Sequence, residues 1–281
     1  MTTAVTGATG HLGALVVDGL VERGVNAGDV VAIVRDSAKA QHLADRGIEV
    51  RVAEYGDVDA LKAAFGGVDK LLLVSGSEIG QRVAQHTNVI EAAEAAGVSF
   101  IAYTSILKAD TSGVSLAAEH LETEKRLAAS SIPSAFLRNG WYWENYEGSL
   151  RQTADSGVLL GSAGDGMLAG ASRADYAAAA VSVLLADDQG GKIYELGGDE
   201  RLTYTDLAGV IAQVTGKPVE YRDVPESQYR EMLLGAGLPD FVATMLASAD
   251  AGIARGELDT ESGDLRSLLG RTSTPITDVL S

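Results

Sequence analysis

Three glycines at three-residue spacing follow the first apolar segment of the chain. Residues 3–5 read as a β-strand, residues 6–13 have the sequence TGATGHLG, and residues 11–23 read as a helix. In such a strand–turn–helix unit, Gly7 permits a tight turn, Gly10 lets the backbone approach a pyrophosphate, and Gly13 allows close helix–strand contact. Free amides at the helix N-terminus then face the anion. The motif predicts a dinucleotide site, with a purely structural turn as the alternative.

The first half of the chain continues this alternation of apolar strands and Ala-rich helices. A parallel strand that is buried on both faces reads as a continuous apolar run, and LLLV at 71–74 has that character. The predicted strands are residues 30–34, 48–53, 71–74, 100–103 and 134–137. The predicted helices are residues 37–46, 58–65, 79–96 and 116–129. Repeated βα units predict an α/β fold with a doubly wound parallel sheet of the Rossmann type.

The rhythm changes after about residue 140. The predicted helices there are residues 144–156, 173–185, 204–215, 226–235 and 240–252, and the predicted strands are 158–160, 192–196 and 219–223. We expect an NADP-binding Rossmann domain over residues 1–145, to which some later segments return. Residues 146–281 are expected to form a smaller α/β substrate-binding lobe.

Charge and composition exclude several classes of function. The chain has 22 Lys and Arg against 39 Asp and Glu, a formal charge of −17, which argues against nucleic acid and anionic membranes as partners. It has no cysteine, and its four histidines are dispersed, so no metal site is expected. The missing cysteines and the lack of a recognisable signal peptide or apolar span lead us to expect a cytoplasmic protein.

Residues after the second, third and fourth predicted strands indicate which cofactor binds. Arg35 ends the second strand, where an Arg pairs with the 2′-phosphate of NADP and an acid would bind a ribose hydroxyl. The alternative is that Arg35 is a surface cation and Asp36 selects the cofactor. Asp57 either contacts adenine or caps the next helix. The small residues Ser75, Gly76 and Ser77 would let the backbone approach the nicotinamide ribose, with Glu78, Gln81 and Arg82 beside the mouth of the site.

The helix over residues 116–129 lacks the usual proton donor of short-chain dehydrogenases. Those enzymes use a Tyr-x-x-x-Lys pair, but the position four residues before Lys125 is Leu121. Lys125 is a candidate contact to the nicotinamide ribose or, alternatively, a charge on an exposed helix face; His120 and Glu124 are the other polar groups nearby. Reduction of an alkyl ketone needs a matched acid. A quinone yields a weakly basic phenolate, so the missing tyrosine favours a quinone or a similarly activated acceptor.

The segment FLRNGWYWEN at 136–145 ends the sixth predicted strand, at the sheet edge where ligands bind. Its amides and flat aromatic rings suit a nicotinamide ring beside a planar acceptor. Trp141 and Trp143 have core packing as their alternative role. Arg173 begins a later helix and either reaches the ligands or pairs with an acid such as Asp175. The candidate catalytic residues are Lys125, Tyr142 and Asn145.

The sequence resembles the NmrA-like branch of the atypical short-chain dehydrogenases, and within it the bacterial NADPH-dependent quinone oxidoreductases of type 2. The stretches that carry this resemblance are AVTGATGHLG (4–13), VAIVRDSAKA (31–40), KLLLVSGSEIGQR (70–82), FIAYTS (100–105), EHLETEK (119–125), LRNGWYWEN (137–145) and ASRADYAAAA (171–180). The glycine motif is shared by the whole superfamily, whereas SGSEIGQR together with LRNGWYWEN is more specific. The last hundred residues match less recognisably.

The resemblance implies flavin-free hydride transfer from NADPH to a quinone. It implies that Arg35 binds the 2′-phosphate and that Ser75–Ser77 and Arg173 border the nicotinamide half. It assigns the pyrophosphate to Gly7, Ala8, Thr9, Gly10, His11 and Leu12, and the nicotinamide to Asn139, Gly140, Trp141, Tyr142, Trp143 and Glu144. The alternatives are a reductase of a triphenylmethane dye and an NADP-binding redox sensor without turnover. The oligomeric state is open, with a homodimer as one hypothesis.

Overall fold

The computed structural model describes residues 1–78 and 80–281 and divides the chain into two compact units. Unit 1 comprises Met1–Ser105, Glu119–Arg138 and Tyr176–Tyr194. Unit 2 comprises Ile106–Ala118, Asn139–Asp175 and Glu195–Ser281. Each unit is therefore assembled from separated stretches of the chain. The assignment of cofactor binding to residues 1–145 and of substrate binding to residues 146–281 stays a prediction.

A seven-stranded sheet has the strand order β3-β2-β1-β4-β5-β6-β8. Its strands are β1 (Thr3–Thr6), β2 (Val30–Val34), β3 (Glu49–Val52), β4 (Lys70–Leu73), β5 (Phe100–Ile106), β6 (Ser134–Asn139) and β8 (Ile193–Leu196). The pairs β3–β2, β2–β1, β1–β4 and β4–β5 are parallel. Because the order runs outward in both directions from β1, the sheet is doubly wound, which confirms the predicted α/β class.

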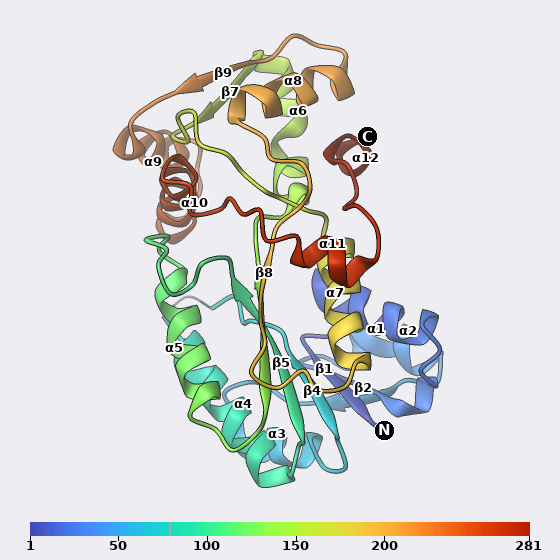
Figure 1. Cartoon of the computed structure of the whole chain (residues 1–281). Coiled ribbons are helices and arrows are strands. Elements are labelled where there is room, and N and C mark those ends of the chain that lie inside the picture. Colours follow the sequence, from blue (N-terminus) through green and yellow to red (C-terminus); the bar gives the residue numbers. More distant parts are fainter. Residues whose placement is uncertain (79) are drawn as a thin grey trace. The chain divides into compact units, whose positions relative to one another are not determined.

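Helices cover both faces of this sheet in unit 1 (Figure 1). They are α1 (His11–Glu22), α2 (Gln41–Ala44), α3 (Val58–Ala64), α4 (Arg82–Ala96), α5 (Ala117–Ala128) and α7 (Arg173–Leu185). Phe65, Ile90 and Leu127, from the α3, α4 and α5 segments, share one apolar core with Leu71 and Ile101 of the strands. On the other face α1 packs against α7, where a Cβ on Gly19 would lie 3.1 Å from Val181.

The predicted elements differ from the observed ones mainly at their ends. The helix expected over residues 37–46 is a 3₁₀ turn at Ala38–Ala40 followed by the single turn of α2. The expected start of the next long helix falls on Ile79, outside the described residues, and α4 begins at Arg82. It ends at Ala96 and is followed by Gly97, which adopts the left-handed conformation (φ +79°) that favours glycine as a helix terminator.

Unit 2 is built around a second, small parallel sheet of β7 (Val158–Gly161) and β9 (Glu220–Asp223). Its helices are α6 (Glu147–Ser156), α8 (Tyr204–Thr215), α9 (Glu226–Gly235), α10 (Asp240–Ala254), α11 (Asp264–Leu269) and α12 (Ile276–Leu280). A capping box of Thr203 and Asp206 starts α8. Leu159, Leu207 and Ile253 lie in its apolar core. The two short C-terminal helices α11 and α12 were not predicted, because one or two turns carry little periodic signal.

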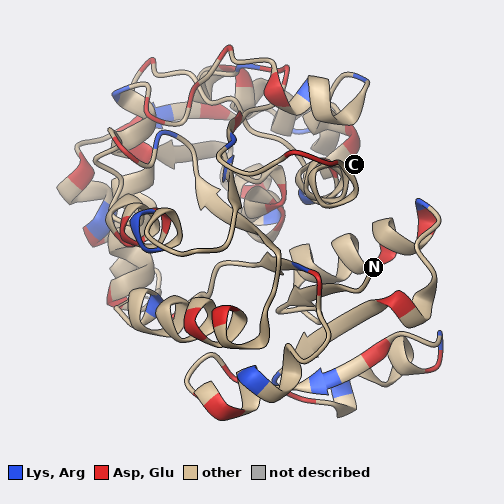
Figure 2. Cartoon of the chain, turned by 60° about the horizontal axis from the view of Figure 1, so that its bottom comes forward, with Lys and Arg blue, Asp and Glu red and all other residues tan. Residues whose placement is uncertain are grey.

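Acidic residues lie on helices and loops along the whole chain, with Lys and Arg dispersed among them (Figure 2). The net negative charge is therefore a property of both units and not of one acidic tail. Among residues 1–78 and 80–281, no helix combines the length and apolarity that a bilayer crossing needs. The same residues contain no cluster of three or more His, Asp or Glu arranged to hold a metal ion.

Candidate functional site

The glycine loop of unit 1 lies between β1 and α1 and has the geometry that the sequence predicts. Gly7 has φ +59°, and its carbonyl accepts a hydrogen bond from the Gly10 amide at 2.8 Å. A Cβ on Gly13 would lie 2.3 Å from the Gly7 oxygen, so only glycine permits this approach of helix and loop. No side chain caps α1, which leaves its first amides for an anion. Gly7, Thr9, Gly10 and His11 are exposed; Ala8, Leu12 and Gly13 are buried behind them.

Arg35 and Asp36 follow β2 and have different partners. The Asp36 carboxylate accepts a hydrogen bond from the Ala38 amide at 2.9 Å, so it is engaged in its own turn. Arg35 is an exposed cation whose guanidinium lies 3.2 Å from a carboxylate oxygen of Glu78. This arrangement favours Arg35 over Asp36 as the group that selects the cofactor, because a guanidinium is suited to a phosphate.

Asp57 caps α3, since its carboxylate accepts a hydrogen bond from the Ala60 amide at 2.9 Å. Capping was one of two roles expected for this residue; the adenine contact stays a prediction. Side chains from other segments bind the backbone amides of the Ser75–Ser77 turn after β4. The Ser75 amide donates to Thr104 Oγ1 at 2.8 Å, and the Gly76 amide donates to His86 Nε2 at 3.0 Å.

His86 and Arg82 of α4 secure this turn, and sequence reasoning did not find the role of His86. His86 accepts from Gly76 through Nε2, so Nδ1 carries the proton and donates to Thr123 Oγ1 at 3.0 Å. Arg82 Nε donates to the Gly76 carbonyl at 2.9 Å, and its guanidinium pairs with Glu119 at 2.7 Å. Burial, together with the nearby Arg82 charge, lowers the pKa of His86 to about 3. The turn therefore rests on a neutral imidazole at physiological pH.

Helix α5 presents Lys125 to solvent and directs other polar residues into unit 1. The Lys125 side chain is 60 % exposed and pairs with Glu122 at 2.7 Å. His120 and Glu124 are buried: His120 Nδ1 lies 2.7 Å from the Tyr103 hydroxyl, and Glu124 pairs with the buried Arg138. Burial also lowers the pKa of His120. This placement favours the alternative reading of Lys125 as a surface charge, and its catalytic role stays a prediction.

In unit 2, the residues after β6 form a polar cluster with Arg173 at the start of α7. The Glu144 carboxylate accepts a hydrogen bond from the Arg173 amide at 2.8 Å, and the Arg173 guanidinium donates to Asn145 Oδ1 at 3.0 Å. The same guanidinium lies 5.2 Å from the centre of the Tyr142 ring. Burial raises the pKa of Tyr142. The structure thus brings together the expected catalytic residues Tyr142 and Asn145 and the expected cofactor ligands Glu144 and Arg173. Their roles stay predictions.

Trp141 and Trp143 belong to the apolar core of unit 2, which was their alternative role. Trp143 is 1 % exposed, and a Cβ on Gly170 would meet its ring at 2.6 Å. The indole therefore packs directly against backbone. Gly140 donates its amide to the Leu196 carbonyl at 2.8 Å. These residues shape the cluster; a direct contact of either indole with a cofactor stays a prediction.

Buried polar atoms in the unit 2 cluster lack a hydrogen-bond partner and fit a bound amide. Asn139 Oδ1 and Glu144 Oε2 are buried acceptors without a donor. Such groups are costly to bury unless something satisfies them. Both would accept from the carboxamide N–H groups of a nicotinamide. In unit 1, the uncapped N-terminus of α1 and the Arg35 cation supply donors for phosphates. The residues present therefore fit NADP(H).

A second polar cluster of unit 2, which sequence reasoning missed, surrounds Asp250 of α10. Its carboxylate accepts from the Tyr204 hydroxyl at 2.6 Å and from the Ser162 amide at 2.9 Å. The Tyr204 hydroxyl in turn accepts from that of Tyr146 at 3.2 Å. Burial raises the pKa of Asp250 to about 6, although these hydrogen bonds oppose the rise. No local spacing signals this cluster, because its members come from distant segments.

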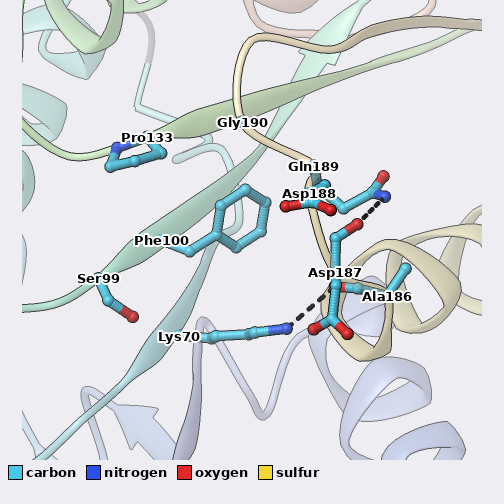
Figure 3. Close-up of a pocket in the computed structure, with 9 residues that line it drawn as sticks. All are labelled: Lys70, Ser99, Phe100, Pro133, Ala186, Asp187, Asp188, Gln189 and Gly190. Atoms are coloured by element: carbon cyan, nitrogen blue, oxygen red, sulfur yellow. Dashed lines mark hydrogen bonds between the residues drawn. The ribbon is translucent and has the colours of Figure 1, made fainter.

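A cavity of about 410 Å³ lies at the amino ends of the unit 1 strands, opposite the carboxyl ends that carry the glycine loop (Figure 3). Lys70 there donates from Nζ to the carbonyls of Leu184 and Ala186 at 2.7 and 3.1 Å. Its ammonium group therefore caps the end of α7. The cavity is lined by Lys70, Ser99, Phe100, Pro133, Ala186, Asp187, Asp188, Gln189 and Gly190, none of which is a predicted site residue.

Known proteins are similar to this chain in sequence and in fold over nearly their whole length. Quinone oxidoreductase 2 of Escherichia coli is 51 % identical over 278 residues, which cover 99 % of this chain and 97 % of that protein. The crystal structure of the NADPH-dependent quinone oxidoreductase of E. coli complexed with NADPH has a TM-score of 0.97 and covers 99 % of this chain and 98 % of that one. The likeness therefore includes the last hundred residues, where the sequence resemblance was weakest.

A triphenylmethane reductase from Citrobacter sp., crystallised with NADP(H), is also similar. It is 38 % identical, has a TM-score of 0.94, and the match covers 99 % of each chain. The model of the NmrA-like family matches residues 1–258. The match covers most of both units, and the fold and the glycine loop agree with it. The chain belongs to the NmrA-like family.

Proposed function

We propose that this protein is an NADPH-dependent quinone reductase that works without a flavin. The observation that carries the proposal is the 51 % identity, over 99 % of the chain, to quinone oxidoreductase 2 of E. coli, which was crystallised with NADPH. Two features of the chain support it independently. In unit 1, no side chain caps the N-terminus of α1, and Arg35 provides an exposed cation. In unit 2, Asn139 and Glu144 have buried acceptor atoms that suit an amide.

We assign each part of NADPH to groups of the chain with matching chemistry. The first backbone amides of α1 bind the pyrophosphate, because no side chain caps this helix N-terminus. Arg35 binds the 2′-phosphate through its guanidinium. The Ser75–Ser77 backbone, held by His86, borders the nicotinamide ribose. Asn139 and Glu144 accept hydrogen bonds from the carboxamide.

When bound, NADPH supplies the hydride that, with one proton, converts a quinone into a hydroquinone. The chain contributes position and electrostatics. His86 and His120 are neutral, so they add no charge near the Ser75–Ser77 turn. Arg173 places a cation over Tyr142, which stabilises an anion developing beside that ring. A phenolate needs no matched acid, so the absent tyrosine at position 121 is compatible with this reaction.

The test is the initial rate of NADPH oxidation with a small 1,4-benzoquinone, measured with NADH in parallel and without protein as control. We expect a protein-dependent rate that is faster with NADPH. A triphenylmethane dye is tested as a second acceptor. Turnover of the dye but not of the quinone would identify a reductase of a different delocalised electrophile. Cofactor binding without turnover of either acceptor would reject the proposal and favour a redox sensor.

Arg35→Ala tests the cofactor assignment separately. Loss of a charge-assisted contact of about 1.5–3 kcal/mol predicts a KM for NADPH about 10- to 100-fold higher, with little change for NADH. Equal increases in the KM for NADPH and for NADH would mean that Arg35 does not bind the 2′-phosphate. A cytoplasmic location and a homodimeric assembly stay predictions.

A further inference from the structure

The ion pair of Arg35 and Glu78 crosses the carboxyl end of β1. In the sheet β1 lies between β2 and β4, and it is hydrogen-bonded to both. Arg35 follows β2 directly, and Glu78 lies in the segment after β4. Their side chains approach to 3.2 Å, so the pair joins the two loops that flank the glycine loop. All of these residues belong to unit 1.

Two further contacts define where this pair lies. The second carboxylate oxygen of Glu78 accepts a hydrogen bond from Gln85 Nε2 of α4 at 2.8 Å, so the helix positions the carboxylate. The Tyr55 hydroxyl donates to the Val74 carbonyl at 2.7 Å and lies 2.6 Å from Thr6 Oγ1, at the ends of β4 and β1. Tyr55 thus ties the end of β1 to the end of β4, which leads into the segment that carries Glu78.

Resting on the proposed function, we propose that Glu78 is a specificity-determining residue that competes with the 2′-phosphate of NADPH for Arg35. In the free protein the Glu78 carboxylate is paired with the Arg35 guanidinium. A 2′-phosphate replaces it as the anionic partner, and Glu78 is released. NADH has no group that can make this exchange. Glu78 therefore lowers the affinity for NADPH and leaves that for NADH nearly unchanged.

The exposure of both side chains limits the size of the effect. They are 69 % and 50 % exposed, and exposed ion pairs are weak. The carboxylate additionally repels an incoming phosphate at short range. Together these two contributions predict a change in affinity of about threefold to tenfold, which shrinks as salt screens both charges.

The experiment measures the Kd of NADPH, NADH and adenosine 2′,5′-bisphosphate for wild type and Glu78→Gln at low and high salt. The glutamine keeps the shape and can still accept from Gln85. We expect NADPH and the bisphosphate to bind Glu78→Gln about three to ten times more tightly at low salt, with NADH within about twofold. Asp59→Asn, which removes an almost fully exposed carboxylate of α3, is the control for net charge.

A double-mutant cycle with Arg35→Gln assigns the effect to this pair. In the Arg35→Gln background, Glu78→Gln should give a clearly smaller gain in affinity for either phosphate ligand, because only the repulsion by the carboxylate remains to be relieved. Unchanged or weaker NADPH binding by Glu78→Gln, an equal gain for NADH, or an equal gain in Asp59→Asn would each overturn the proposal. Cofactor binding without quinone turnover would reject the reductase function alone, whereas a wild type that binds neither phosphate ligand would reject both.

Discussion

Unit 1 and unit 2 both bury ionisable side chains, but they do so with opposite chemistry. In unit 1, His86 and His120 lie in the interior with lowered pKa values, and Glu124 is matched by the guanidinium of Arg138. In unit 2, Asp250 lies among tyrosine hydroxyls and its pKa is raised to about 6. These unit 1 groups are neutral or ion-paired at pH 7, whereas Asp250 of unit 2 is an acid that ionises near neutrality. The two units should therefore respond to charge removal and to pH in different ways.

The largest effect is expected from Glu124→Gln in unit 1. Arg138 and Glu124 are 5 % and 4 % exposed, and their bond of 2.7 Å is removed from solvent. Removing the carboxylate leaves a buried guanidinium without this counterion, which costs about 3–5 kcal/mol of unfolding free energy. Urea unfolding measures the loss. Glu122→Gln on the same helix is the matched control, because Glu122 is exposed; losses of equal size would remove the contrast between buried and exposed pairs.

Asp250→Asn tests the opposite behaviour of unit 2. The pKa of Asp250 is about 6 in the folded protein against 3.8 for an unperturbed aspartate, so the folded state binds the extra proton between these pH values. This residue therefore stabilises the fold at about pH 4, and that contribution is lost as the pH rises through about 6, by about 3 kcal/mol. The difference in unfolding free energy between variant and wild type should change by this amount across that range. A pH-independent difference would contradict the raised pKa.

His86→Leu sharpens the comparison from the side of unit 1. The pKa of His86 is about 3 in the folded protein against 6.5 for an unperturbed histidine, so only the unfolded chain gains a proton between these two pH values. Its stability contribution is present above pH 6.5 and is lost as the pH falls, opposite in sign to Asp250. The variant leaves the Gly76 amide unsatisfied and should lose about 1–3 kcal/mol at pH 7. The free energy of unfolding of the variant should also fall less between pH 7 and pH 5 than that of the wild type.

Cofactor binding by His86→Leu separates its positioning role from general stability. We expect a higher Kd for NADPH and NADH alike at temperatures where the variant is fully folded, because the Ser75–Ser77 turn loses its support. His86→Gln can restore an acceptor to the Gly76 amide and should recover part of the affinity. An unchanged Kd in His86→Leu would mean that the histidine supports only the core.

Lys125→Ala should have the smallest effect. Its side chain is exposed and pairs with Glu122 within one helix turn, an arrangement worth about 0.3–0.5 kcal/mol. We expect the thermal midpoint and the KM for NADPH to remain close to wild type. A large increase in that KM would instead place Lys125 at the cofactor, as the sequence analysis first expected.

Local patterns were sufficient for the sheet and the glycine loop. The alternation of apolar strands and helices predicts the doubly wound order, because each βα unit has one favoured hand. The spacing of Gly7, Gly10 and Gly13 predicts a close approach that the structure contains between Gly13 and the Gly7 carbonyl. The short helices α11 and α12 escaped prediction because they are too brief to show a period.

The sequence by itself determined the fold class, the family and the residues of the glycine loop, since these depend on neighbours along the chain. Tertiary structure decided which way each candidate side chain points. The four-residue spacing of His120 and Glu124 puts both on the buried face of α5, so the adjacent Lys125 faces solvent. Thr123, which bonds His86, and the partners of Asp250 come from segments far away in the sequence, and no local pattern indicates such contacts. Burial then sets their pKa values, because the cost of holding a charge depends on what surrounds it in three dimensions.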